Sequence, residues 1–198
     1  MEFFDAAVLT MPVPQILQLP HMIDILDQDI SSKLSKVSYA SRYALGLFFD
    51  KQEASVILNE SNPNISVRYI KGDPILTYVS LEGKRRGKIS SATSVTFHAR
   101  VPWSLEHLET PIPEVEKMLL DHCKKIYPNW PQPASVKCQR WRYSQVYKPF
   151  EGTPKAVVLH EEPLIVAGGD AFVAKYATVD DCFASARKIS DIICSKNL

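Results

Sequence analysis

Two glycines and an aspartate near the carboxyl end of the chain could bind a phosphorylated or electron-rich ligand. Gly168, Gly169 and Asp170 follow the apolar run Leu164–Ala167 and precede a helical pattern. Glycines let a ligand approach the backbone, and the unpaired amides at a helix start favour negative charge. The Asp170 carboxylate could accept hydrogen bonds from ligand hydroxyls. The same residue is equally typical of a turn that stabilises its own backbone.

Three further side chains could line a site, although each also fits a structural role. His98 alternates with its neighbours as a strand residue, which favours a structural histidine. Trp141 stands between Arg140 and Arg142 and is typical of a core or interface anchor. Tyr69 is an ordinary strand residue. The residues alone therefore leave the ligand undecided.

Several common catalytic and metal-binding patterns are missing from the sequence. The seven glycines allow no G-x-G-x-x-G, and no serine lies in a Gly-x-Ser-x-Gly elbow. The five histidines show no metal-ligand spacing and the four cysteines include no Cys-x-x-Cys pair, so no metal site is expected. Four scattered cysteines indicate reduced thiols of an intracellular protein, although counting alone also allows two disulfides.

The net charge and the hydropathy of the chain limit the classes of partner that we expect. The 23 basic and 22 acidic side chains give a net charge of +1, so neither nucleic acid nor an anionic membrane surface is expected as a partner. The longest apolar runs are far shorter than the roughly 18 residues of a membrane span. Lys84–Arg86 and Lys88, interrupted by glycine, predict an exposed hairpin tip. With no signal peptide at the amino terminus, we expect a cytoplasmic protein.

The elements that would position these residues form an α+β pattern. Apolar residues at helical spacing predict helices over 22–37 and 113–126 and from about residue 178 or 180 to the end, the last with an apolar face that includes Val179 and Phe183. Thr178–Asp181 resembles a capping box. Segments rich in β-branched and aromatic residues predict a mainly antiparallel sheet: 43–49, 66–71, 75–81 and 93–101. Further strands are predicted at 136–141, 156–159 and 164–167, the last of the kind found inside a parallel sheet.

A strand is also predicted almost at the start of the chain, over Asp5–Thr10. A domain rarely opens directly into a fully apolar strand, which suggests that further sequence precedes it. Without their partners, this strand and Leu164–Ala167 would expose unpaired edges, through which the chain could associate with itself.

Four segments together resemble the renalases, members of the flavin amine oxidase family, in order and approximate spacing. The resemblance spans nearly the whole chain. The segments are Val8–Pro14, Ser41–Phe48, Lys137–Val146 and Ala167–Phe172.

The resemblance implies two parts: an FAD domain of Rossmann type, split in the sequence, and a substrate domain built on an antiparallel sheet with helices. By this likeness residues 1–15 and 160–198 are returning pieces of the FAD domain, and residues 16–159 form the substrate domain. The first strand of the FAD domain and its glycine-rich turn are then absent from this sequence.

Particular residues acquire roles by the same resemblance. The Gly168–Asp170 turn would meet the ribityl–pyrophosphate region of FAD. The helix that begins near Asp181 and Cys182 would direct its amides at the flavin pyrimidine edge, which is negatively charged when reduced. Tyr69, His98 and Trp141 would line the cavity over the flavin and stack a nicotinamide ring.

One departure from the family pattern concerns the last helix. Family members often have Ser-Gly there, whereas this chain has Ala184-Ser185-Ala186. The packing of this helix against a flavin is therefore less well supported by the resemblance.

The activity implied by the family is oxidation of dihydronicotinamide dinucleotide isomers to NAD(P)+, with O2 as the final acceptor and hydrogen peroxide as a product. Because the dinucleotide-binding motif is missing, the sequence leaves open whether this chain alone is an enzyme. The alternative is a non-catalytic remnant or interaction module of the flavin amine oxidase family.

Overall fold

A computed structural model describes residues 4–60, 66–87 and 93–196, without the side chains of 51–52 and 58–60. The chain forms two compact units. One comprises Met1–Ala40 with Tyr143–Leu198, and the other comprises Ser41–Arg142. The sequence-based division instead grouped residues 16–40 and 143–159 with the middle of the chain.

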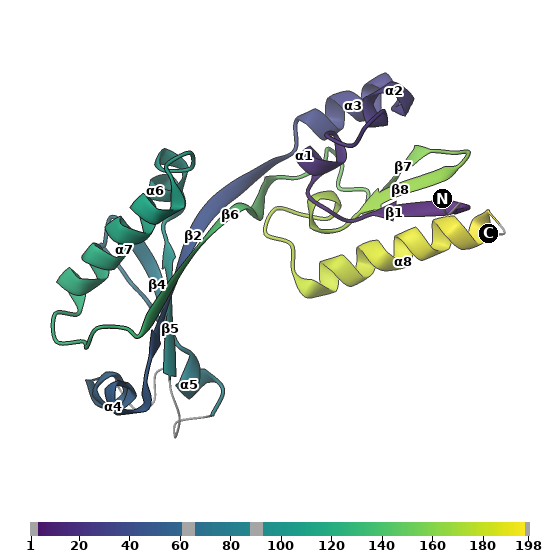
Figure 1. The fold of residues 1–198 in the computed structure, drawn as a ribbon. Helices are drawn as coiled ribbons and strands as arrows, with labels where there is room; N and C mark the ends of the chain where they lie inside the picture. The colour runs from purple at the N-terminus through teal and green to yellow at the C-terminus, as the bar shows by residue number, and fades with distance from the viewer. Residues whose placement is uncertain (1–3, 61–65, 88–92, 197–198) are drawn as a thin grey trace. The chain divides into compact units, whose positions relative to one another are not determined.

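The unit of residues 41–142 is built on a five-stranded sheet (Figure 1). It contains the four segments predicted to form an antiparallel sheet and also the further strand predicted at 136–141. The strand order is β3-β4-β5-β2-β6, and the pairs β3–β4, β4–β5 and β5–β2 are antiparallel. The strands are β3 (Val67–Tyr69), β4 (Leu76–Leu81), β5 (Thr93–Ala99), β2 (Ser38–Phe49) and β6 (Ser135–Lys148).

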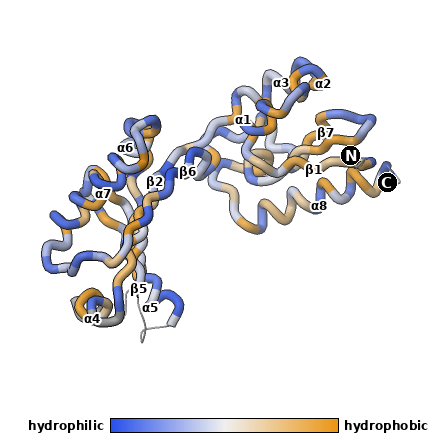
Figure 2. Tube along the Cα trace, viewed as in Figure 1, coloured by the Kyte–Doolittle hydropathy of each residue, from blue (hydrophilic) through white to orange (hydrophobic). Residues whose placement is uncertain are grey.

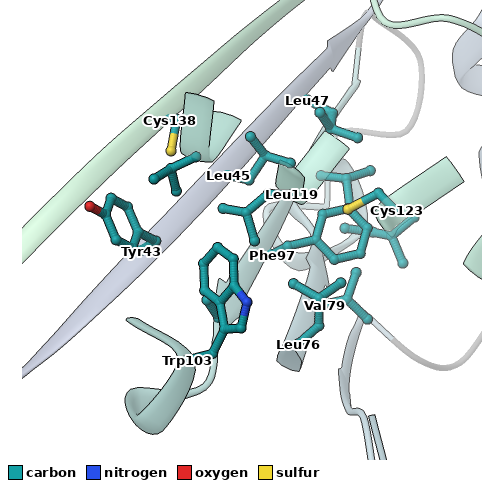
Figure 3. Close-up of a cluster of buried hydrophobic side chains, with 14 of the residues drawn as sticks. Tyr43, Leu45, Leu47, Leu76, Val79, Phe97, Trp103, Leu119, Cys123 and Cys138 are labelled. Carbon is teal, nitrogen blue, oxygen red and sulfur yellow. The ribbon is translucent and has the colours of Figure 1, made fainter. Parts of the chain in front are cut away.

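One face of this sheet carries the core of the unit, because alternate residues of β2 and β5 are buried. Figure 3 shows Tyr43, Leu45 and Phe97 packed with Trp103 and Leu119. The last two residues come from helices that cover this face. The helices that contribute to the core are α4 (Lys51–Glu60), α6 (Val101–Glu106) and α7 (Ile112–Ile126).

The opposite face of the sheet, here called the outer face, has no such helical cover within residues 41–142 that the structure describes. The short helix α5 (Glu82–Arg85) lies on this side, away from α7 (Figure 1). Of the predicted basic hairpin tip, Lys84 and Arg85 lie in α5 between the paired strands β4 and β5, and Arg86 caps the helix. Lys88 lies outside the described residues.

The unit formed by the chain ends contains a three-stranded sheet of order β1-β8-β7. β1 pairs parallel with β8, and β7 pairs antiparallel with it. Figure 2 shows that these strands are rich in hydrophobic residues. The elements are β1 (Ala6–Leu9), β7 (Ala156–His160), β8 (Leu164–Gly168), α1 (Val13–Ile16), α2 (Met22–Ile25), α3 (Gln28–Ser35), η1 (Asp170–Phe172) and α8 (Val179–Ser195).

The prediction of unpaired edges is correct only for β1. β8 is the central strand and has a partner on each side, so it exposes no edge for self-association. Among the described residues β1 pairs with β8 alone, and its Val8 is 43% exposed. No helix in the described part of the chain is long and apolar enough to span a membrane.

The single helix predicted over residues 22–37 is wrong, because the chain breaks at Leu26. Leu26 is extended, with φ −78° and ψ 138°. The Asp27 carboxylate then accepts hydrogen bonds from the amides of Asp29 and Ile30 and so begins α3. The apolar spacing continues through Leu26 and Asp27, but the Asp27 cap begins a new helix there, so the predicted helix is divided into α2 and α3.

We expect Gly168→Ala to lower the free energy of unfolding by about 1–3 kcal/mol, because overpacking strains a tight contact. A Cβ at this position would lie 2.5 Å from Ile189 Cδ1 and 2.8 Å from Ser185 Oγ of α8. Urea denaturation measures the change. Ala186→Ser, on the exposed side of α8, should change the free energy by less than about 0.5 kcal/mol. Equal stability of the Gly168→Ala variant would contradict the close packing of α8 on β8.

Candidate functional site

Three ring side chains form a row across the outer face of the five-stranded sheet. Antiparallel register places Tyr69 opposite Tyr78, and Tyr78 opposite His98. The Tyr78 and His98 rings stack with centroids 4.7 Å apart, and the Tyr69 ring meets Tyr78 edge-on at 5.7 Å. On the far side of His98 the register brings Ala44 of β2, which has only a small side chain. We call Tyr69, Tyr78 and His98 the ring row.

His98 is held in its neutral form near neutral pH. Burial lowers the pKa of its imidazole, and the positive charge of Arg42 lowers it further. The negative charge of Glu82 acts in the opposite direction but does not outweigh these two effects. A neutral imidazole has one N–H donor and one acceptor nitrogen. His98 can therefore hydrogen-bond an amide group, and it adds no positive charge to the ring row.

Trp141 lies on the same outer face, two strands from His98. Its neighbours on β6 face the helices: Arg140 donates to the Leu108 carbonyl at 2.6 Å, and Arg142 forms an ion pair with Glu109. Alternation along a strand then directs Trp141 to the other side. Its side chain is 55% exposed. The structure thus brings the three predicted substrate-side residues, Tyr69, His98 and Trp141, to one sheet face.

Tyr78 is the member of the ring row that sequence reasoning did not identify as a site residue. The available signal was its place in the predicted strand 75–81. Its stacking on His98 depends on the register of β4 against β5, which the local pattern of either strand does not contain.

The Gly168–Asp170 turn has two glycines with different physical causes. Gly168 is required because α8 packs directly against β8. Gly169 adopts φ +111°, a conformation that other residues rarely reach. Its amide donates to Ser185 Oγ at 2.8 Å, and this hydroxyl donates to the Lys155 carbonyl at 2.6 Å. Within this turn, the group left exposed to a ligand is the carboxylate of Asp170.

Ser185 is a second residue whose role the sequence alone did not reveal. The Ser185 side chain is buried, with 1% of its surface exposed. Its hydrogen bonds to the Gly169 amide and the Lys155 carbonyl connect α8 to the turn and to the residue just before β7. The replacement of Ser-Gly by Ser185-Ala186 leaves this junction intact, because the Ala186 side chain is on the exposed side of α8.

The start of α8 uses some of its amides within the chain. Thr178 Oγ1 accepts from the Asp181 amide at 3.2 Å, and the Thr178 carbonyl accepts from the Cys182 amide at 3.2 Å. The Asp181 carboxylate accepts from the Thr178 amide at 2.9 Å and completes the predicted capping box. Helix geometry leaves the Val179 and Asp180 amides without an intrahelical acceptor.

The apolar face predicted for this helix is partly wrong. Ser185 and Ile189 are its buried residues, whereas Val179 is 73% exposed and Phe183 is 65% exposed. The residues that pack on β8 are set by the direct contact with Gly168, which turns the side chains of Val179 and Phe183 outward.

The groups at the turn and at the start of α8 have the chemistry to meet a flavin, but they are not all the residues that the resemblance implied. The exposed Asp170 carboxylate can accept hydrogen bonds from ribityl hydroxyls. The amides of Val179 and Asp180, in the first turn of α8, can face an electron-rich ring edge. The amides of Gly169, Asp181 and Cys182 are engaged within the chain. The Gly-Gly pair and the capping residues therefore shape the turn, while Asp170 and the Val179–Asp180 amides are the groups that can meet a ligand.

Metal and thiol chemistry find little support in the residues that the structure describes. They include no group of three or more side chains that could hold a metal ion. All four cysteines are free, and burial raises the pKa of the Cys123 thiol to about 12 and that of Cys138 to about 11. These two thiols stay protonated and unreactive near neutral pH.

Comparison with known proteins identifies a relative by sequence. No protein-family model matches the chain. Renalase of Mus musculus is 34% identical over 195 residues, which cover 97% of this chain and 55% of renalase. The chain is therefore similar to renalase over nearly its whole length and spans about half the length of that relative.

Two crystal structures share the fold at low sequence identity. A candidate protoporphyrinogen oxidase from Exiguobacterium sp. 255-15 matches with a TM-score of 0.68 and 18% identity, over 97% of this chain and 41% of that protein. An oxidoreductase from Methanosarcina mazei matches with a TM-score of 0.59 and 12% identity, over 96% of this chain and 43% of that protein.

Replacing Arg42 by Gln should raise the pKa of His98 toward its ordinary value of about 6.5, because a repelling charge is removed. Titration of the His98 Cε1–H signal by NMR measures both proteins. The unaltered chain should give a pKa below the ordinary value. A His98 pKa at or above that value, or one that the substitution leaves unchanged, would contradict the neutral imidazole described above.

Proposed function

We propose that this renalase-like chain is the substrate-facing part of an FAD-dependent oxidoreductase that oxidises dihydronicotinamide dinucleotide isomers to NAD(P)+. The observation that carries the proposal is the ring row with its neutral histidine on an exposed sheet face. The similarity to renalase along almost the whole chain supports the same assignment.

The ring row suits a flat, uncharged dihydronicotinamide. Tyr69 is 72% exposed and Tyr78 stacks on His98, so the row offers aromatic surface to a planar ring. Trp141 adds a further exposed indole on the same face. Because His98 is neutral, it can exchange hydrogen bonds with a carboxamide without placing a cation beside a ring that becomes positive on oxidation.

Orientation and exclusion of water are the contributions expected from these residues. Loss of a hydride from the dihydronicotinamide carbon needs no base, so holding that carbon in a reactive geometry can supply most of the acceleration. A bound FAD would supply the hydride acceptor and the route by which the two electrons reach O2, with hydrogen peroxide as the product once a proton is taken from solvent.

The cofactor contacts that we propose are made by polar groups of the unit formed by the chain ends. The Asp170 carboxylate would accept hydrogen bonds from ribityl hydroxyls beside the Gly168–Gly169 turn. The Val179 and Asp180 amides would face the flavin pyrimidine edge, where a helix amino terminus stabilises negative charge. Asp181 and Cys182 would act indirectly, by holding this helix start in place.

A second candidate function is an interaction module without catalysis. It is favoured by exposed apolar side chains on the end-segment unit: Val8 of β1 and Val179 and Phe183 of α8. A contiguous apolar surface to which such side chains contribute would be suited to bind another protein. This candidate predicts a chain that associates with protein but binds no flavin.

Flavin binding separates the two candidates. The purified 198-residue chain, mixed with FAD and passed over a desalting column, should retain the visible absorption of oxidised flavin. Asp170→Ala should weaken FAD binding about 10-fold or more, because a charge-assisted hydrogen bond contributes about 1.5–3 kcal/mol. Asp191→Ala, which removes an exposed carboxylate from the distant part of α8, is the matched control. A colourless protein would reject the flavoenzyme proposal.

Substrate oxidation tests the ring row. With flavin bound, anaerobic addition of a dihydronicotinamide isomer of NAD should bleach the flavin absorption, and admitting O2 should restore it with release of peroxide. Trp141→Ala should slow the bleaching about 10-fold or more if the indole positions the substrate. Met118→Ala, an exposed side chain of α7 on the opposite side of the sheet, should leave the rate unchanged. Equal rates in both variants would remove Trp141 from the site.

A further inference from the structure

A groove of about 450 Å³ continues from the ring row along the outer face of the five-stranded sheet. A volume of this size is in the range that holds small-molecule ligands. Tyr78 and His98 bound it at one end. The register then leads to Ser80 opposite Thr96, and β4 runs directly into α5. Gly46 of β2 adds no side chain to its floor.

The far end of the groove carries positive charge. Arg85 Nε and a terminal nitrogen lie 3.0 and 2.8 Å from Glu82 Oε2, and Arg86 Nε lies 3.6 Å from the same oxygen. One carboxylate thus faces two guanidinium groups. The Glu82 side chain is only 13% exposed, while Arg85 and Arg86 are 54% and 68% exposed.

Glu82 fixes the two arginines to the sheet. Its Oε1 accepts a hydrogen bond from Ser80 Oγ at 2.6 Å, so the carboxylate is bound to β4 as well as to α5. Burial alone would raise the pKa of Glu82, but the bonds from Ser80 and Arg85 outweigh it and the pKa is lowered. The carboxylate stays ionised, and each guanidinium keeps donors beyond those that Glu82 accepts.

We propose that this groove binds a phosphate-bearing nucleotide lengthwise, with its flat ring at Tyr78 and His98 and its phosphate at Arg85 and Arg86. The identity of the ring as a nicotinamide rests on the proposed function. The phosphate end rests on the arginine pair and the groove that leads to it.

Strand geometry supports this direction of binding. From His98 to Ser94, β5 advances by about 13 Å, since a strand rises about 3.3 Å per residue. Both residues line the groove, with Thr96 between them. A ribose between ring and phosphate would therefore lie beside hydroxyl side chains, which can exchange hydrogen bonds with its own hydroxyls.

A pair of ligands that differ only by the phosphate tests the proposal. Isothermal titration calorimetry of the 198-residue chain without flavin should give tighter binding for nicotinamide mononucleotide than for nicotinamide riboside. The double variant Arg85→Ala/Arg86→Ala should weaken mononucleotide binding about 10-fold or more, as expected for a lost charge-assisted contact. Riboside binding should stay within about twofold, since charged contacts no longer contribute.

Two control variants guard against trivial causes. Arg187→Ala removes an exposed arginine of α8 and should not change mononucleotide affinity. Arg86→Lys keeps a positive charge and should retain part of the affinity for the mononucleotide. Urea midpoints close to that of the unaltered chain show that the double variant is folded.

The result separates this inference from the proposed function. Arginine-dependent binding of the mononucleotide in a chain that takes up no FAD would support the groove and reject the oxidoreductase. No measurable mononucleotide binding, equal losses for both ligands, or the same loss in Arg187→Ala would overturn the groove proposal, whatever the flavin experiments give.

Discussion

The antiparallel register of β3, β4, β5 and β2 is the constraint on which the candidate substrate site depends. It aligns Tyr69, Tyr78 and His98 across three strands and places Ala44 beside them. The same strands bury Leu45 and Phe97 on their other face, under α6 and α7. A shift by one residue would turn the core residues outward and the rings inward. The hydrophobic core therefore fixes the positions of the site residues.

In the unit formed by the chain ends, close packing of α8 on β8 has the corresponding role. Gly168 allows the contact, and the buried Ser185 hydroxyl joins the Gly169 amide to the Lys155 carbonyl. These bonds use groups that a glycine-rich turn could otherwise offer to a ligand. The exposed Asp170 carboxylate and the first amides of α8 remain, so the proposed flavin contacts are fewer than the sequence motif alone indicated.

Local patterns were sufficient to predict most elements, including α7, the strands of both sheets and the Thr178–Asp181 capping box of α8. They failed where one interaction overrode a pattern, as when Asp27 capped α3 and broke the predicted helix. The short helices α4 and α6 were also missed, since tertiary packing of residues such as Ile57 and Trp103 stabilises them. Tyr78 was not recognised because stacking across strands depends on register, and the unit boundaries inside β2 and β6 depend on packing that no local pattern reveals.

The central claim is that a nicotinamide ring lies on Tyr78 and His98. Intermolecular nuclear Overhauser effects between the ring protons of nicotinamide mononucleotide and the side chains of the 198-residue chain test it most directly. The account predicts cross-peaks from the nicotinamide protons to the Tyr78 and His98 rings. Cross-peaks confined to other side chains, such as those of α8, would contradict it.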